Sequence, residues 1–212
     1  MVSDKYIRQA QLLVQALPYV AQEDCFALKG GTAINLFVRN MPRLSVDIDL
    51  TYVQIEDRQT SLTNMDAALE RILELLKQNL NAQVRRIAGG GQNDTRIQIQ
   101  TGQTQIKIET SPVGRGTLFP PELRRMTDAA EDRLGFAEMP VVAFEELYAG
   151  KLVAALDRQH PRDLFDVKLL LENEGISDEL WPMWRVPAAR CTKFCGHRQS
   201  QFKKPTKINL QA

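Results

Sequence analysis

The sequence has few of the residues that build disulfide frameworks and zinc sites. Its 212 residues include three cysteines and two histidines, namely Cys25, Cys191, Cys195, His160 and His197. An odd and sparse set of cysteines argues against a disulfide-stapled fold. Zinc sites need clustered ligands, so neither residue type indicates a metal centre. We therefore expect a protein of a reducing compartment, the cytoplasm.

Long apolar runs and a strong net charge are also lacking. No run approaches the roughly 20 residues that span a bilayer, and polar residues such as Asp4 stand where a signal peptide would be apolar. No membrane partner is therefore expected. The net charge of +1 argues against a basic nucleic-acid-binding surface over the whole chain, although a local basic patch is compatible with it. Walker and Rossmann glycine motifs are absent, which argues against ATPases and dinucleotide-binding proteins.

Hydrophobic periodicity predicts one α/β (α+β) domain with a mixed, mostly antiparallel sheet covered by helices. Helical spacing is expected over residues 3–17, up to Pro18, and again over 32–38 and 61–80. Short apolar or alternating patterns predict about five strands, at 25–28, 44–53, 83–87, 95–101 and 104–110. The last two strands, separated by Gly102 and Gln103, predict an antiparallel hairpin.

The pattern changes after Pro112. Two glycines and two prolines between 114 and 121 indicate a loop, and the next regular patterns are helical, over 144–156 and 162–171. Pro161 suits the first turn of the second helix. Beyond about Trp181 no periodicity is visible. We predict a core at 1–118, a helical region at 119–176 and a poorly organised tail at 177–212, for which truncation or a frameshift is one explanation.

Two aspartates are candidates for binding a divalent metal. Asp47 and Asp49 are two apart on an alternating strand, so both carboxylates lie on one face while Ile48 and Leu50 lie on the other. Mg²⁺ typically takes one or two protein carboxylates together with substrate phosphates. The alternative is a strand whose outer face carries solvated aspartates.

A glycine pair precedes these aspartates. Gly30, Gly31 and Thr32 lie between a short strand and a helix, where glycine lets backbone amides approach a phosphate near a helix N-terminus. Glycine pairs are also common in ordinary turns. The order strand, Gly-Gly-Thr, helix and Asp-x-Asp strand is more specific than either motif alone.

The residues that carry these motifs resemble a known family. The segments LKGGTAINL (28–36) and RLSVDIDL (43–50) are similar to the AbiEii/AbiGii toxin family of the polymerase-beta-like nucleotidyltransferase superfamily. The resemblance continues in KIE (107–109), KLVAALDR (151–158) and RDLFD (162–166) and covers roughly residues 25 to 170. It implies a polymerase-beta-like core followed by a helical region that completes the nucleotide site.

The resemblance also implies an activity. It predicts Mg²⁺-dependent transfer of a nucleoside monophosphate from a nucleoside triphosphate to an acceptor hydroxyl, with Mn²⁺ as the alternative ion and tRNA as the first acceptor to consider. A protein hydroxyl or a small molecule would need the same donor site. The protein would be the toxin of a toxin–antitoxin or phage-defence system, with a separately encoded antitoxin as its partner.

The resemblance assigns roles to individual residues. The implied metal ligands are Asp47, Asp49 and Glu109. The implied catalytic residues are Asp47, Asp49, Glu109 and Lys151. The implied nucleotide-binding residues are Gly30, Gly31, Thr32, Lys151, Arg158 and Asp163. Glu109 would act as a base or as a metal ligand, and it faces away from Ile106 and Ile108, so it can join the aspartates if the two strands are neighbours.

Other interpretations of these residues stay open. Glu109 would also suit a surface strand charge. The charged residues between 157 and 166 would suit a salt-bridged helix corner, with Arg162 and Asp166 as an i,i+4 pair. At the level of function, the rivals are a nucleotide-binding regulator without catalysis and a truncated, inactive relative that acts as an interaction protein.

Overall fold

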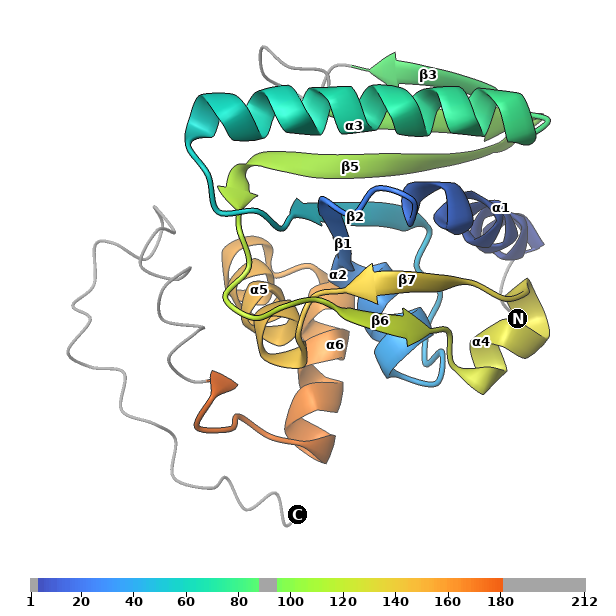
Figure 1. Ribbon diagram of the computed structural model, residues 1–212. Helices are drawn as coiled ribbons and strands as arrows, with labels where there is room; N and C mark the ends of the chain where they lie inside the picture. Colours follow the sequence, from blue (N-terminus) through green and yellow to red (C-terminus); the bar gives the residue numbers. More distant parts are fainter. Residues whose placement is uncertain (1–3, 88–94, 181–212) are drawn as a thin grey trace. The chain divides into compact units, whose positions relative to one another are not determined.

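The computed structural model describes residues 4–87 and 95–180 (Figure 1). The chain divides into two compact units, residues 1–147 and 148–212. The predictions for Trp181, Cys191, Cys195, His197 and the tail beyond residue 180 lie outside the described residues. Cys25 carries a free thiol. Within the described ranges, no helix combines the length and the apolar character needed to cross a membrane.

A seven-stranded sheet forms the first unit, with the strand order β3-β4-β5-β2-β1-β7-β6 (Figure 1). The strands are β1 (Phe26–Lys29), β2 (Asp47–Tyr52), β3 (Gln83–Ile87), β4 (Arg96–Thr101), β5 (Thr104–Arg115), β6 (Glu122–Arg125) and β7 (Glu138–Val141). The β2–β5 and β1–β7 pairs are parallel and the other four pairs are antiparallel. A mixed, mostly antiparallel sheet is therefore confirmed.

Strands β6 and β7 were not predicted: the sheet has seven strands where about five were expected. Both are four residues long, too short for a clear period-two pattern. The edge strand β6 is mostly charged, and β7 contains Pro140, which cannot donate a backbone hydrogen bond to a neighbouring strand. Their place is set by pairing instead: Leu28 aligns with Val141, and the Val142 amide donates to the Leu28 carbonyl at 3.1 Å.

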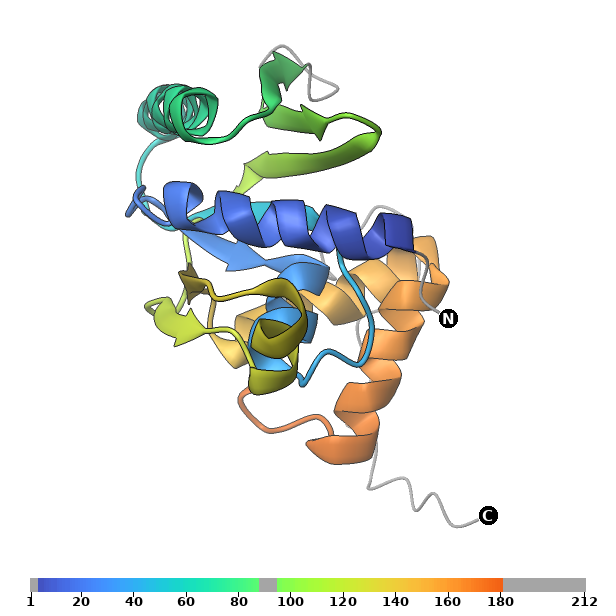
Figure 2. The same ribbon diagram turned by 90° about the vertical axis from the view of Figure 1, so that its right-hand side faces the viewer.

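Helices of the first unit pack against the sheet. They are α1 (Asp4–Val20), α2 (Gly30–Thr32), the π-helix η1 (Ala33–Val38), α3 (Arg58–Asn79) and α4 (Asp128–Leu134). Helix α1 contacts β5, β7, α3 and α4, and Figure 2 shows it lying lengthwise over the sheet. It continues through Pro18 because that residue lies in the last turn, where one lost backbone bond matters little and Leu17 and Val20 stay fully buried.

The alternating strands bury one face and leave the other partly exposed. Ile48 and Leu50 of β2 and Ile108 of β5 are fully buried, whereas Asp47 is exposed and Asp49 is partly exposed. The predicted alternation of β2 is thus confirmed. The sheet therefore presents Asp47 and Asp49 on its less covered face.

Helices α5 (Phe144–Arg158) and α6 (Pro161–Asn173) follow. Helix α5 begins in the first unit and continues into the second, whose described part consists of its remainder, α6 and residues up to 180. Pro161 lies in the first turn of α6, as predicted, and the His160 side chain caps this helix by accepting a hydrogen bond from the Arg162 amide at 3.2 Å.

Candidate active site

Four charged residues lie in one row across the centre of the sheet. Strand register aligns Lys29 of β1 with Asp49 of β2, Asp49 with Glu109 of β5, and Glu109 with Arg96 of β4. Aligned residues of neighbouring strands project from the same face. The row therefore brings two predicted carboxylates together and flanks them with two cations.

The glycine pair lies directly against this row. A Cβ atom added to Gly30 would overlap Asp49 Oδ2 and lie 3.1 Å from Asp49 Cβ, and the φ angle of Gly30 is +75°, which side chains rarely adopt. A Cβ atom at Gly31 would lie 2.9 Å from both Arg43 Nη2 and Ser45 Oγ. Gly30 therefore needs to be glycine, whereas the crowding at Gly31 comes from the side-chain ends of Arg43 and Ser45.

A cavity of about 260 Å³ opens beside the row. Its walls come from β1, β2, β4 and β5 and the residues next to them, namely Lys29, Asp49, Leu50, Thr95, Arg96, Glu109, Thr110, Ser111 and Pro112. The four charged residues of the row thus all line one hollow. Both signs of charge are present, which suits a ligand that carries phosphates together with a divalent cation.

Charge pairs shape the cavity wall. Arg96 Nε lies 3.2 Å from Glu109 Oε1, and about a third of each side chain is exposed. Burial lowers the pKa of Lys29, while the negative charge of Asp49 acts in the opposite direction. Lys29 and Arg96 therefore offset the two carboxylates when the cavity holds no other cation.

Asp47 occupies a different position from Asp49. It is exposed, aligns with Lys107 rather than with an acidic residue, and does not line the cavity. Its backbone carbonyl accepts a 2.6 Å hydrogen bond from Thr32 Oγ1, which fixes the end of α2 to the start of β2. The role of Thr32 in nucleotide binding stays a prediction. In the structure, its side chain connects α2 to β2 through this hydrogen bond.

The fit of a divalent cation rests on Asp49 and Glu109. Among residues 4–87 and 95–180, no three His, Cys, Asp or Glu side chains are grouped so that they could hold a metal ion. Two adjacent carboxylates in one cavity nonetheless match the usual protein contribution to Mg²⁺ bound with substrate phosphates. The assignment of Asp47, Asp49 and Glu109 as a three-ligand set stays a prediction.

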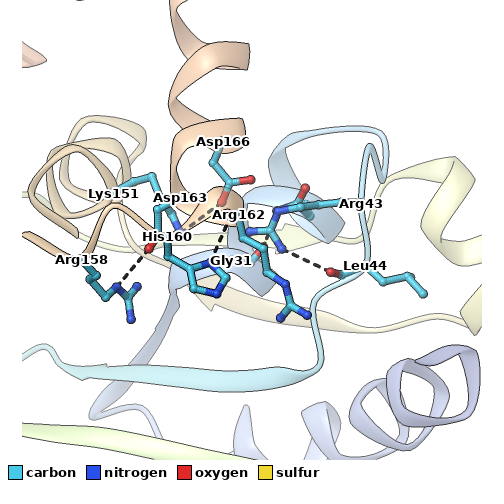
Figure 3. Close-up of polar contacts among 10 residues, drawn as sticks. Gly31, Arg43, Leu44, Lys151, Arg158, His160, Arg162, Asp163 and Asp166 are labelled. Atoms are coloured by element: carbon cyan, nitrogen blue, oxygen red, sulfur yellow. Dashed lines mark hydrogen bonds and ion pairs between the residues drawn. The ribbon is translucent and has the colours of Figure 1, made fainter. Parts of the chain in front are cut away.

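In the second unit, a buried lysine pairs with two carboxylates (Figure 3). Lys151 Nζ lies 2.8 Å from Asp163 Oδ1 and 3.1 Å from Asp166 Oδ2, and all three side chains are at least nine-tenths buried. Arg158 Nε lies 3.0 Å from Asp163 Oδ2, with 62% of its side chain exposed. The pairing of Asp166 with Lys151 links α6 to α5 and was not predicted.

Opposing effects act on Asp163. Burial pushes the pKa of its carboxyl upward, but the hydrogen bond and charge of Lys151, together with Arg158, outweigh burial and hold the pKa below its ordinary value. Asp163 is therefore ionised near neutral pH, as its two partners require.

Lys29 and Arg96 line the cavity but were missing from the predicted site. Lys29 was visible as the residue before Gly30, and its burial beside Asp49 could not be read from its position alone. Arg96 could have been predicted from the hairpin, because a two-residue turn at Gly102 and Gln103 fixes the alignment of Arg96 with Glu109.

A solved structure of a known protein has a similar fold. MenT4, a nucleotidyltransferase toxin from Mycobacterium tuberculosis H37Rv, has a similar structure, with a TM-score of 0.65 and 18% sequence identity over 86% of this chain. The chain spans 64% of the length of that protein. A search of curated protein sequences found no significant match.

The family comparison is more specific than the structural one. The model of the family described as "Nucleotidyl transferase AbiEii toxin, Type IV TA system" matches residues 11–210. This range includes both glycines, the Asp-x-Asp strand, Glu109 and the buried ion cluster of α5 and α6. Because the match covers more than half of the sequence, the chain belongs to the AbiEii nucleotidyltransferase toxin family of type IV toxin–antitoxin systems.

Proposed function

We propose that this protein transfers a nucleoside monophosphate from a nucleoside triphosphate to a hydroxyl group of tRNA, in a Mg²⁺-dependent reaction that releases pyrophosphate. The observation that carries this proposal is the alignment of Asp49 with Glu109 in one cavity, directly against Gly30. A carboxylate pair beside a glycine turn that leads into a helix combines the two requirements of such a site, cation binding and close approach of a phosphate.

The bonds that form and break in the proposed reaction indicate what the residues of the cavity must do. The acceptor oxygen forms a bond to the α-phosphorus, and the bond from that phosphorus to the bridging oxygen breaks, so pyrophosphate leaves and the hydroxyl proton passes to solvent. Asp49 and Glu109, with Asp47 next to them, would hold Mg²⁺. The ion would supply charge stabilisation for the phosphate oxygens.

Cations of the cavity wall complement this set. Lys29 and Arg96 lie on either side of the carboxylate pair, and each can neutralise phosphate charge once a nucleotide enters. Gly30 and Gly31 keep the entry to α2 free of side chains, so the donor can approach the backbone closely. The cavity thus offers separate partners for the metal and for the triphosphate.

Lys151, Arg158 and Asp163 belong to the proposal through the family resemblance. The burial of Lys151 between two carboxylates supports a role in fixing α5 against α6. The exposed guanidinium of Arg158 is better suited to contact a phosphate directly, because it is paired on one side only with the buried Asp163. We keep all three as proposed nucleotide-site residues with these different tasks.

Family membership also supports the biological part of the proposal. The family is one of toxins of type IV toxin–antitoxin systems, so we propose that the protein acts as such a toxin in the cytoplasm and that a separately encoded antitoxin opposes it. Manganese is the alternative ion for the same carboxylates, because it accepts the same oxygen ligands.

The test incubates the full chain with each α-labelled nucleoside triphosphate, Mg²⁺ and total tRNA. Label is expected in the tRNA fraction with the wild type and is expected to be lost with Asp49→Ala. Label transfer that survives this substitution would disprove the assigned site. A folded wild-type chain that transfers label to no acceptor, including a total cell extract, would disprove the activity.

A further inference from the structure

One face of strands β3, β4 and β5 continues outward from the carboxylates. Register aligns Asp47 with Lys107, Lys107 with Gln98, and Gln98 with Arg85, so these four residues form a second row parallel to the first. A third row joins Gln105, Gln100 and Gln83 on the same three strands. This surface, which we call the acceptor face, consists of Gln83, Arg85, Gln98, Gln100, Gln105 and Lys107.

The opposite face of the same strands is covered. Ile97 and Ile106 are buried there, and Arg86 forms ion pairs with Asp66 at 2.8 Å and Glu70 at 3.4 Å, both on α3. Figure 2 shows α3 on one side of this part of the sheet. Because neighbouring residues of a strand alternate, Arg85 and Lys107 lie on the side away from α3, where Arg85 is exposed and Lys107 partly so.

Charge sets these strands apart from the rest of the chain. The whole protein has a net charge of only +1. Strands β3, β4 and β5, however, contain five basic residues, Arg85, Arg86, Arg96, Lys107 and Arg115, and Glu109 is their only acidic residue. Of these five, only Arg85 and Lys107 belong to the acceptor face, because Arg86 pairs with α3 on the opposite face and Arg96 pairs with Glu109 in the first row. The six residues of the acceptor face thus include two cations and no carboxylate, and this charge favours a polyanion.

We propose that the acceptor face binds the sugar–phosphate backbone of a polynucleotide acceptor and leads its reactive end to the carboxylate pair; this inference rests on the proposed nucleotidyl transfer. None of the residues of the face is aromatic, so base stacking, the usual means of holding single strands, is not offered. Lysine and arginine contact phosphates, and the less buried amides of Gln83, Gln100 and Gln105 suit phosphates and ribose hydroxyls. Gln98 is buried, and its amide oxygen accepts hydrogen bonds from Arg85, so it orients that guanidinium. Recognition is therefore of the backbone and not of the base sequence.

Strand spacing sets the length of acceptor that the face can hold. Neighbouring strands lie about 4.8 Å apart, so Lys107 is about 5 Å and Arg85 about 14 Å from the strand that carries Asp47. One nucleotide adds about 3.4 Å along a nucleic-acid strand, so the face spans about four nucleotides. A nucleoside or dinucleotide should consequently be a poor acceptor compared with tRNA.

The test measures binding of fluorescein-labelled tRNA to the full chain without nucleotide, over a series of salt concentrations. The double variant Arg85→Gln/Lys107→Gln is expected to bind at least about tenfold more weakly, with the slope of log affinity against log salt reduced by about two. Lys77→Gln on α3, on the other side of the sheet, removes an exposed lysine as the control and should bind like the wild type. In the transfer assay, the double variant should raise the KM for tRNA and leave the KM for the nucleotide unchanged.

Each outcome separates the two proposals. Equal binding of tRNA by the wild type and the double variant would overturn the proposed role of the acceptor face and leave nucleotidyl transfer standing. Efficient transfer to a protein hydroxyl, with no binding of tRNA, would have the same consequence. Competition by polyglutamate as effective as that by tRNA would also overturn it, because it would show general polyanion binding. Absence of any label transfer by a wild type that binds tRNA would disprove the proposed activity while supporting the face.

Discussion

Gly30 lies so close to the carboxylate of Asp49 that even a methyl group at its Cα would overlap Asp49 Oδ2. The contact joins the glycine turn to the Asp-x-Asp strand, two features that are 19 positions apart in the sequence. The two motifs therefore lie against each other and are not an independent turn and an independent exposed strand.

Gly30→Ala should abolish most of the nucleotidyl transfer. The new methyl group displaces the Asp49 carboxylate, and a misplacement of about 1 Å at a catalytic group can lower the rate by about 100-fold. Gly102→Ala is the matched control, because Gly102 also has a positive φ but no atom lies within 4 Å of an added Cβ. Both variants should lose about 1–2 kcal/mol of unfolding free energy from backbone strain. Equal activities of the two variants would refute the contact as the cause.

Lys29→Met should stabilise the protein at neutral pH. Burial lowers the pKa of Lys29, so the protonated side chain is less favourable in the folded than in the unfolded chain. The wild type should therefore gain stability relative to this variant as pH rises through the lowered pKa towards 10.5, the ordinary value for lysine. Urea unfolding of both proteins at a series of pH values measures this difference.

The control for this experiment is Lys77→Met, since that lysine is about half exposed on α3. It shows what replacing a lysine by methionine does to the free energy of unfolding where the side chain is not buried. A difference between Lys29→Met and the wild type that is constant with pH would contradict the burial of a charged Lys29.

Arg96→Gln should change the response to Mg²⁺ and to nucleotide in opposite directions. Removing the guanidinium 3.2 Å from Glu109 leaves this carboxylate with less competing positive charge, so half-saturation should need less Mg²⁺. The KM for the nucleoside triphosphate should rise, because a phosphate partner is lost. Steady-state kinetics with Mg²⁺ and nucleotide varied in turn measures both.

A suitable control is Arg124→Gln, which removes a guanidinium that pairs with Glu122 on the same strand, β6, outside the cavity. It should leave both constants as in the wild type. An Arg96→Gln enzyme that needs more Mg²⁺ would show that Arg96 helps to position Glu109 for the metal and does not compete with it.

Lys151→Met should destabilise the helices of the second unit. The substitution leaves Asp163 and Asp166 buried without their shared cation, and breaking a buried ion pair costs about 3–5 kcal/mol. Lys168→Met removes an exposed lysine from a surface pair with Glu172 and should cost about 0.5 kcal/mol or less. Denaturant unfolding followed by circular dichroism compares the two variants, and equal losses would contradict the buried cluster.

Acid should weaken the same cluster. The pKa of Asp163 is lowered in the fold, so its contribution to stability is complete above the ordinary value of 3.8 and is lost as pH falls through the lowered pKa. In Lys151→Met the main cause of the lowered pKa is gone, so the wild type and the variant should approach equal stability in strong acid.

Much of the fold could be predicted because hydrophobic periodicity is strong in its longer elements. The pattern of α3 and the alternation of β2, β4 and β5 come from residues that are buried in the structure. Strands β6 and β7 could not be predicted, because four residues carry too little pattern and their place depends on pairing with β1 and with each other. Local sequence contains no information on such partners.

In the candidate site, too, local patterns predicted some residues, while the positions of others depend on which strands or helices pair. Asp47 and Asp49 follow from alternation within one strand, and Arg96 could have been aligned with Glu109 through the hairpin. The parallel pairing of β2 with β5 brings Glu109 beside Asp49. These strands are far apart in the sequence, so the sequence predicted this arrangement only if the two strands proved to be neighbours. Similarly, the i,i+4 spacing favoured Arg162 as a partner of Asp166, and it could not indicate the pairing of Asp166 with Lys151 on the other helix.

The most direct test of the central claim follows the phosphorus atoms. Parallel reactions contain the same nucleoside triphosphate labelled at the α or at the γ position, with Mg²⁺ and tRNA. Nucleotidyl transfer predicts α label in the tRNA and γ label in pyrophosphate, both lost with Asp49→Asn. The appearance of γ label in the tRNA, or of γ label only in inorganic phosphate, would show a kinase or a hydrolase and contradict the account.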